Sequence, residues 1–83
     1  MYRIFILPQA AKDLDALRGK LYSNLKNKIA ALSANPRPFG SLKLTQEEGY
    51  RLRIGDFKIV YRIDDKSRII FIYRVKHRKE VYR

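Results

Sequence analysis

Residues 50–63 carry the pattern that most constrains how this chain can fold. Residues 50–54 and 57–63 alternate apolar with mostly basic side chains on either side of Gly55 and Asp56. Alternation with a period of two indicates strands that bury one face, and Gly-Asp suits a two-residue hairpin turn with a positive φ at its first central residue. The pattern therefore predicts a β-hairpin. Its core-facing side chains are Tyr50, Leu52, Ile54, Phe57, Ile59, Tyr61 and Ile63.

The opposite face of the predicted hairpin carries the basic residues Arg51, Arg53, Lys58 and Arg62. A two-residue turn sets Arg53 directly opposite Lys58. Like charges in that position destabilise a bare sheet, by about 1 kcal/mol or less where both side chains reach water. We therefore expect an anionic ligand to lie on this face. The alternative interpretation is a basic surface that only keeps the protein in solution.

The charge of the whole chain supports an anionic partner. Nineteen Lys and Arg against eight Asp and Glu give a net charge of +11 over 83 residues, and thirteen of the basic residues follow residue 36. A strongly positive chain attracts polyanions. Because the basic residues alternate with aromatic residues, nucleic acid is the favoured partner. An anionic membrane is disfavoured because the basic residues form no amphipathic helix.

Composition also excludes several classes of protein. The chain has no cysteine and a single histidine, which argues against disulfides and structural zinc. It has no apolar run of transmembrane length and no signal-peptide core, so we expect a cytoplasmic protein.

The remaining segments predict a single α+β domain that spans residues 1–83. We expect strands at 2–7, 41–44 and 68–75, helices at about 9–18 and 20–34, and turns or loops at 35–40, 45–49 and 64–67. The order β-α-α-β-β-β-β implies a mostly antiparallel, twisted sheet of four to five strands with an N-terminal helical hairpin on one face. Residues 68–75 are apolar on both faces, which predicts a central strand covered on each side. The helical stripe that should face the sheet is Leu14, Leu17, Leu21, Leu25, Ile29 and Leu32, with Tyr22 inside it or at its edge.

Arginine, lysine, tyrosine and histidine must supply any chemistry. The sequence has no Ser-His-Asp order, glycine-rich phosphate loop or metal triad, and Asp64 with Asp65 is better explained as a turn cap. RNA can be cut without a cofactor, because its own 2′-hydroxyl attacks the adjacent phosphorus. Guanidinium groups bind phosphate oxygens bidentately and stay charged, so Arg51, Arg53 and Arg78 suit this reaction. The alternative is that these residues position phosphate without catalysis.

Other residues have two interpretations each. Lys58 could act as a point charge, and Tyr82 could stack on an RNA base, pass a proton, or simply anchor the chain end. His77 has the only unperturbed pKa suited to proton transfer at neutral pH, but it could equally contact phosphate or be structural. Glu47 or Glu48 could be a general base or part of a solvated loop. Further candidate RNA contacts are Arg62, Lys76, Lys79 and Arg83.

Three segments together resemble the RelE/ParE superfamily of toxin–antitoxin toxins, and within it the RelE branch. They are residues 6–14, 49–63 and 75–83, matched by order and spacing rather than by one specific motif. The resemblance implies a ribosome-dependent endoribonuclease that cuts mRNA in the ribosomal A site without a cofactor. It also implies a cognate antitoxin that blocks the site, with operator DNA bound only through the complex of the two proteins. The net charge of +11 predicts that this antitoxin is acidic.

Within this resemblance, the catalytic basic pair matches Arg51 and Arg53, and the next strand supplies Lys58. The terminal arginine and tyrosine match Arg78 and Tyr82. The best-studied pattern has lysines in the basic pair, and the arginines found here cannot easily act as a base. Another branch uses Glu and His for proton transfer, so the identity of the base and acid stays open. Two other functions also stay open: a ParE-like inhibitor of DNA gyrase, and a non-catalytic RNA-binding module.

Overall fold

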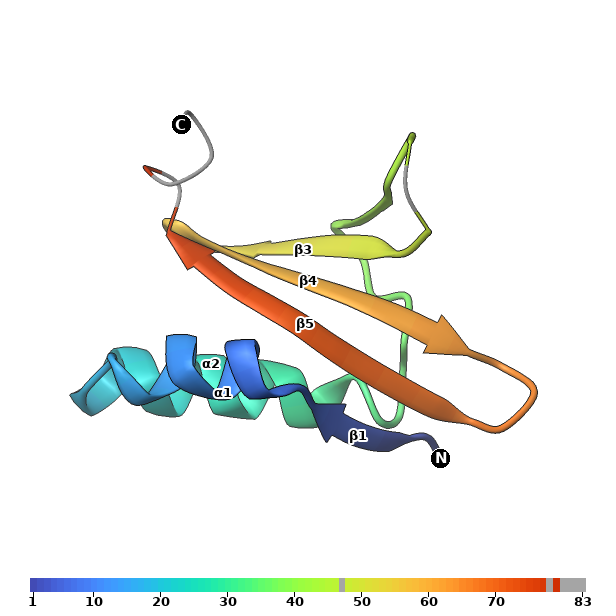
Figure 1. Cartoon of the computed structure of the whole chain (residues 1–83), viewed down its shortest axis with the longest axis horizontal. Helices are drawn as coiled ribbons and strands as arrows, with labels where there is room; N and C mark the ends of the chain where they lie inside the picture. Colours follow the sequence, from blue (N-terminus) through green and yellow to red (C-terminus); the bar gives the residue numbers. More distant parts are fainter. Residues whose placement is uncertain (47, 78, 80–83) are drawn as a thin grey trace.

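The protein folds into a five-stranded sheet with two helices packed against it. The computed structural model describes residues 1–46, 48–77 and 79. Its elements, in chain order, are β1 (Arg3–Ile6), α1 (Pro8–Asp15), α2 (Gly19–Ala31), β2 (Ser41–Lys43), β3 (Tyr50–Ile54), β4 (Phe57–Asp64) and β5 (Ile69–His77). Figure 1 shows α1 and α2 lying together beside the sheet.

The strand order is β1-β5-β4-β3-β2, with β1 parallel to β5 and all other neighbours antiparallel. The predicted α+β class, element order and mostly antiparallel sheet are confirmed. Neither helix in the described part of the chain has the length and hydropathy of a membrane-spanning segment.

The core lies between the two helices and one face of the sheet. Its buried residues are Ala10, Leu14, Leu25, Ile29, Leu32, Leu52, Ile59, Tyr61, Ile70, Ile72 and Val75. The predicted helical stripe is correct except at Leu21, which is 39% exposed. Gly19 has a φ of 64° at the break between the helices, and the new helix turns Tyr22 rather than Leu21 towards the core. We call the sheet face that packs on the helices the core face, and the opposite one the outer face.

The helices are shorter than predicted at their C-terminal ends. Helix α1 begins at Pro8, whose fixed φ and missing N–H are compatible with a first helical turn. Helix α2 ends at Ala31, and residues 32–34 continue only as a turn. Pro36 and Pro38 then keep the chain out of helical geometry.

The β3–β4 hairpin has the predicted register. Ile54 pairs with Phe57, Arg53 with Lys58, and Leu52 with Ile59, so the turn consists of Gly55 and Asp56. Gly55 has a φ of 58°, the positive value that the Gly-Asp sequence predicts.

Strand β5 is an interior strand, as predicted, because it lies between β1 and β4. The helices, however, cover only its core face (Figure 1). Strand β5 also contains a bulge that the sequence does not reveal: Tyr61 pairs with Ile72 and Val60 with Arg74, which leaves Tyr73 as an extra residue. The buried positions of β5 are accordingly Ile70, Ile72 and then Val75. The bulge therefore shifts the alternation of faces by one residue in the last part of the strand.

A carboxylate from α1 holds that last part of β5. Strand β1 pairs with β5 only as far as Ile72, and beyond it Asp13 accepts a hydrogen bond from the Val75 N–H at 2.9 Å. Asp13 also accepts bonds from the Arg74 guanidinium at 2.9 and 3.2 Å. Burial opposes the charge of Asp13, but these bonds hold its pKa below the usual value. The ionised Asp13 thus takes the place of a neighbouring strand.

Candidate nucleic-acid interface

Four basic side chains from three neighbouring strands meet on the outer face. Lys58 in β4 lies between Arg53 in β3 and Lys76 in β5, because it pairs directly with both. Arg51 is two residues before Arg53 and shares its face. We call Arg51, Arg53, Lys58 and Lys76 the basic cluster. The cluster lies at the end of the sheet where the β3–β4 turn meets the C-terminal end of β5 (Figure 1).

The basic cluster is small enough to surround one phosphodiester linkage. Neighbouring strands are about 4.8 Å apart and residues on one face repeat about every 6.7 Å, so the four backbone positions fit an area of roughly 10 by 7 Å. Burial, followed by the positive charges of Arg51, Lys76 and Arg53, lowers the pKa of Lys58. The positive charges of three neighbours thus disfavour the protonated form of Lys58.

No salt bridge among the described residues includes a member of the basic cluster. The ion pairs found there join Arg37 to Asp65, Arg62 to Glu48 and Arg74 to Asp13, and none includes a member of the cluster. The same part of the chain also has no group of three His, Cys, Asp or Glu side chains placed to hold a metal ion. The cluster can therefore bind an anion without first breaking a salt bridge.

Arg62 shares the outer face but lies apart from the cluster. It pairs with Phe71, four residues along β4 from Lys58, which corresponds to roughly 13 Å. Its Nε donates to the Tyr73 hydroxyl at 3.1 Å, its guanidinium lies 4.9 Å from the Phe71 ring centre, and Glu48 is 3.6 Å away. These contacts already occupy Arg62 within the protein, and they also pair Glu48 with a cation away from the cluster.

His77 lies on the other face of the sheet. It pairs with Phe57, and the two rings meet edge to face with their centres 5.0 Å apart. Its Nδ1 accepts a hydrogen bond from the Lys79 N–H at 3.2 Å. Because Phe57 packs against the core, the structure does not bring the His77 ring together with the basic cluster.

The other predicted site residues divide into three groups. Lys79 is exposed just beyond β5. Asp64 accepts the Ser67 N–H at 3.2 Å, as predicted for a turn cap, whereas Asp65 binds Arg37 of the 35–40 connector at 2.8 Å. Glu47, Arg78, Tyr82 and Arg83 lie outside the described residues.

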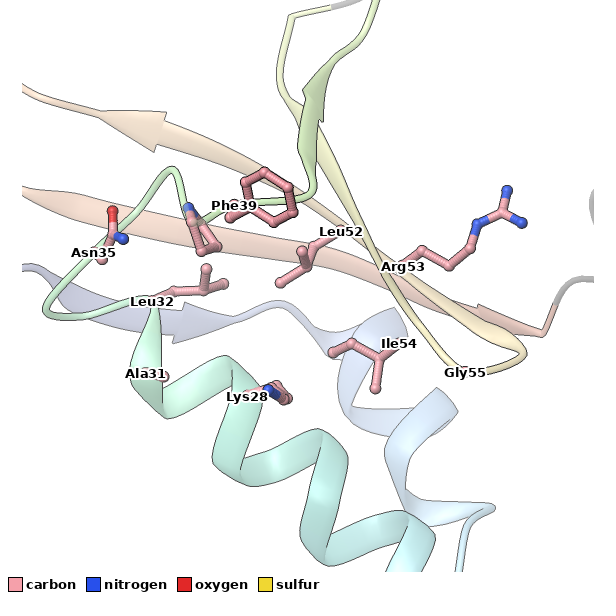
Figure 2. A pocket seen from close by; sticks show the side chains of 10 residues that line it. Lys28, Ala31, Leu32, Asn35, Phe39, Leu52, Arg53, Ile54 and Gly55 are labelled. Atoms are coloured by element: carbon pink, nitrogen blue, oxygen red, sulfur yellow. The ribbon is translucent and has the colours of Figure 1, made fainter.

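A second surface, which the sequence pattern did not reveal, lies on the core side of β3. A groove of about 500 Å³ runs between α2 and the end of β3, lined largely by Ala31, Leu32, Pro38, Phe39, Leu52 and Ile54. Phe39 is 105% exposed, which is unusual for a large aromatic side chain. Figure 2 shows Leu32, Leu52 and Ile54 around the groove, with Lys28 on the helix side and the Arg53 side chain directed away. Phe39 was the only sequence feature that could have indicated the groove. The groove is formed by α2 and β3, which are far apart in the sequence.

Comparisons with known proteins agree with this architecture. The family described as ParE toxin of type II toxin-antitoxin system, parDE, matches residues 4–82. The designated toxin RelE1 of Methanocaldococcus jannaschii is 29% identical over 86 aligned positions, which cover 99% of this chain and 96% of the relative.

Two solved structures show the same fold. The toxin–antitoxin complex RelBE2 of Mycobacterium tuberculosis contains a chain that is 28% identical with a TM-score of 0.82, covering 93% of this chain and 98% of the other. For the archaeal RelE–RelB complex of Pyrococcus horikoshii, the identity is 29%, the TM-score 0.79 and the coverage 93% and 94%. The chain therefore belongs to the ParE toxin family of type II toxin–antitoxin systems, within the RelE/ParE superfamily, and has the fold of the RelE toxins.

Proposed function

We propose that this toxin is an endoribonuclease that cuts mRNA on the ribosome and so stops translation. The observation that carries the proposal is the basic cluster: four cations on one open sheet face, with no acidic partner among the described residues. The similarity to RelE toxins supports the choice of RNA as the anion.

The proposed reaction uses the nucleophile within the RNA. The 2′-hydroxyl attacks the neighbouring phosphorus, and the guanidinium groups of Arg51 and Arg53 bind the non-bridging oxygens as negative charge develops on them. Lys58 and Lys76 add positive charge from the next two strands. By their resemblance to RelE residues, Arg78 and Tyr82 are proposed to complete the site. The proposed chemistry itself uses no metal ion.

The matching family description also names ParE, which makes a gyrase inhibitor the second candidate function. To distinguish the two functions, the toxin is induced briefly in cells, and the process that stops first is identified. We expect protein synthesis to stop before DNA replication, and new mRNA 5′ ends to appear within coding regions. A replication block without new 5′ ends would support the gyrase inhibitor instead. Intact mRNA on toxin-bound ribosomes would indicate a non-catalytic binding module.

We further propose a cognate acidic antitoxin whose apolar side chains enter the groove beside Phe39. The two solved structures described above are toxin–antitoxin complexes. Lys28 at the groove and the absence of acidic residues from α2 favour an acidic segment over a basic one. An amphipathic segment would also cover the exposed Phe39 ring. The complex, rather than the toxin, is proposed to bind operator DNA.

Phe39→Ser is expected to weaken the antitoxin complex by about tenfold or more, because buried aromatic anchors commonly contribute more than 1 kcal/mol to an interface. The dissociation constant is measured with the antitoxin encoded next to this gene, at two salt concentrations. Leu42→Ser is the matched control, since Leu42 is 55% exposed on the outer face, outside the groove. Unchanged binding by the Phe39 variant would place the antitoxin elsewhere.

A further inference from the structure

We infer that the side-chain amine of Lys58 is the general base of the proposed RNA cleavage and accepts the proton of the attacking 2′-hydroxyl. The inference rests on the proposed nuclease function and assigns one chemical role within the same site. The evidence is the place of Lys58 in the sheet, the chemistry of its neighbours, and the positions of the alternative bases.

Lys58 is the central member of the basic cluster. Arg53 pairs with it from β3 and Lys76 from β5, and Arg51 adds a second guanidinium on the β3 side. Lys58 is half-buried in this position, whereas Arg53 is exposed. A phosphate held by the two guanidiniums would thus lie directly beside the Lys58 amine.

The two arginines of the cluster cannot act as the base. A guanidinium stays protonated in proteins, so Arg51 and Arg53 can bind phosphate but cannot take a proton from it or its sugar. A lysine can do so once its charged form is disfavoured. Burial first, and then the charges of Arg51, Lys76 and Arg53, lower the pKa of Lys58, whereas no carboxylate of the described residues pairs with it. The free-amine fraction of Lys58 at neutral pH is therefore larger than that of an ordinary lysine.

Two alternative bases in the described part of the chain, His77 and Glu48, lie away from the basic cluster. His77 lies on the core face against Phe57. Glu48 is 3.6 Å from Arg62, about four residues along β4 from Lys58. Of these three candidates, Lys58 is the one that lies within the basic cluster, and it occupies the position between Arg53 and Lys76.

The step is balanced without any added reactant. The Lys58 amine takes the proton as the O2′–phosphorus bond forms and the phosphorus–O5′ bond breaks. The products are a 2′,3′-cyclic phosphate and a 5′-hydroxyl end. The departing O5′ takes a proton from water, and the Lys58 ammonium later returns its proton to solvent.

The test compares Lys58→Arg with the wild type in single-turnover cleavage of a labelled mRNA bound to purified ribosomes. Arginine keeps the positive charge but cannot act as a base, so we expect the cleavage rate to fall about 100-fold or more, as is usual when a general base is lost. Binding to the ribosome should change by less than about threefold, because the charge remains. Lys43→Arg is the matched control, since Lys43 is exposed in β2 and outside the basic cluster.

The pH profile and chemical rescue by an added amine distinguish a role of Lys58 in proton transfer from a purely structural role. The wild-type rate should rise with pH as Lys58 loses its proton, and this rise should be absent in Lys58→Arg. Lys58→Ala should regain activity with added methylamine but not with added guanidinium, and a thermal melt shows that each variant is folded.

Two results would overturn the inference, and they have different consequences for the proposed function. If Lys58→Arg cleaves like the wild type with the same pH profile, Lys58 is not the base but the nuclease function stands. If the wild type itself leaves ribosome-bound mRNA intact, the proposed function and the inference fall together.

Discussion

Arg53→Ala is expected to abolish growth arrest in cells that express the toxin, and to slow mRNA cleavage by about 10²- to 10³-fold. This is the usual effect of removing one preorganised donor that stabilises charge in a transition state. Arg53 is exposed and forms no ion pair with the described residues, so its loss should leave the fold intact. Both effects are measured with the same protein, by colony formation after induction and by cleavage of ribosome-bound mRNA.

The control for this experiment is Arg3→Ala. Arg3 is also an exposed arginine in the sheet, but it lies in β1, which pairs with the far end of β5. The two variants have the same net charge, so a general loss of electrostatic attraction would affect them equally. Full toxicity of Arg53→Ala would show that the basic cluster is not the catalytic site.

Gly49→Ala is expected to lower the free energy of unfolding by about 3 kcal/mol or more. Gly49 has a φ of 128°, a conformation that other residues adopt only with strain of about 1–3 kcal/mol. An added Cβ would also lie 2.7 Å from the Tyr61 carbonyl oxygen, which belongs to the backbone of the central part of the sheet. Chemical denaturation followed by circular dichroism measures the loss.

The matched control is Gly19→Ala. Gly19 also has a positive φ, of 64°, but a Cβ there would meet no atom within 4 Å. Its cost should therefore be limited to the strain of the left-handed conformation, about 1–2 kcal/mol. Equal destabilisation of the two variants would mean that the contact with Tyr61 has no energetic importance.

Local patterns were sufficient to predict the hairpin and its charged face. Alternation and a two-residue turn together determine which residues pair, so the opposition of Arg53 and Lys58 followed directly from the sequence. Gly19 similarly marked the break between the helices. In both cases, neighbours in sequence decide the structure.

The other half of the basic cluster depends on a feature that local patterns do not show. An unbroken alternation after Ile72 would place Val75 and His77 on the outer face, but the extra residue Tyr73 brings Lys76 there instead. Nothing in a run of apolar residues marks where such a bulge occurs, because the register between β4 and β5 determines it. For the same reason His77 could not be assigned to a face from the sequence alone.

The Asp13 contact has a consequence for how the chain behaves among its own copies. A strand edge with free N–H and C=O groups is a template on which a second chain can add, and such edges promote aggregation. Among the described residues, no strand pairs with β5 beyond Ile72 on the β1 side, yet Asp13 accepts the Val75 N–H and binds Arg74 beside it. The Asp13 carboxylate therefore blocks the edge of the sheet next to the basic cluster, where self-association would compete with the proposed binding of RNA.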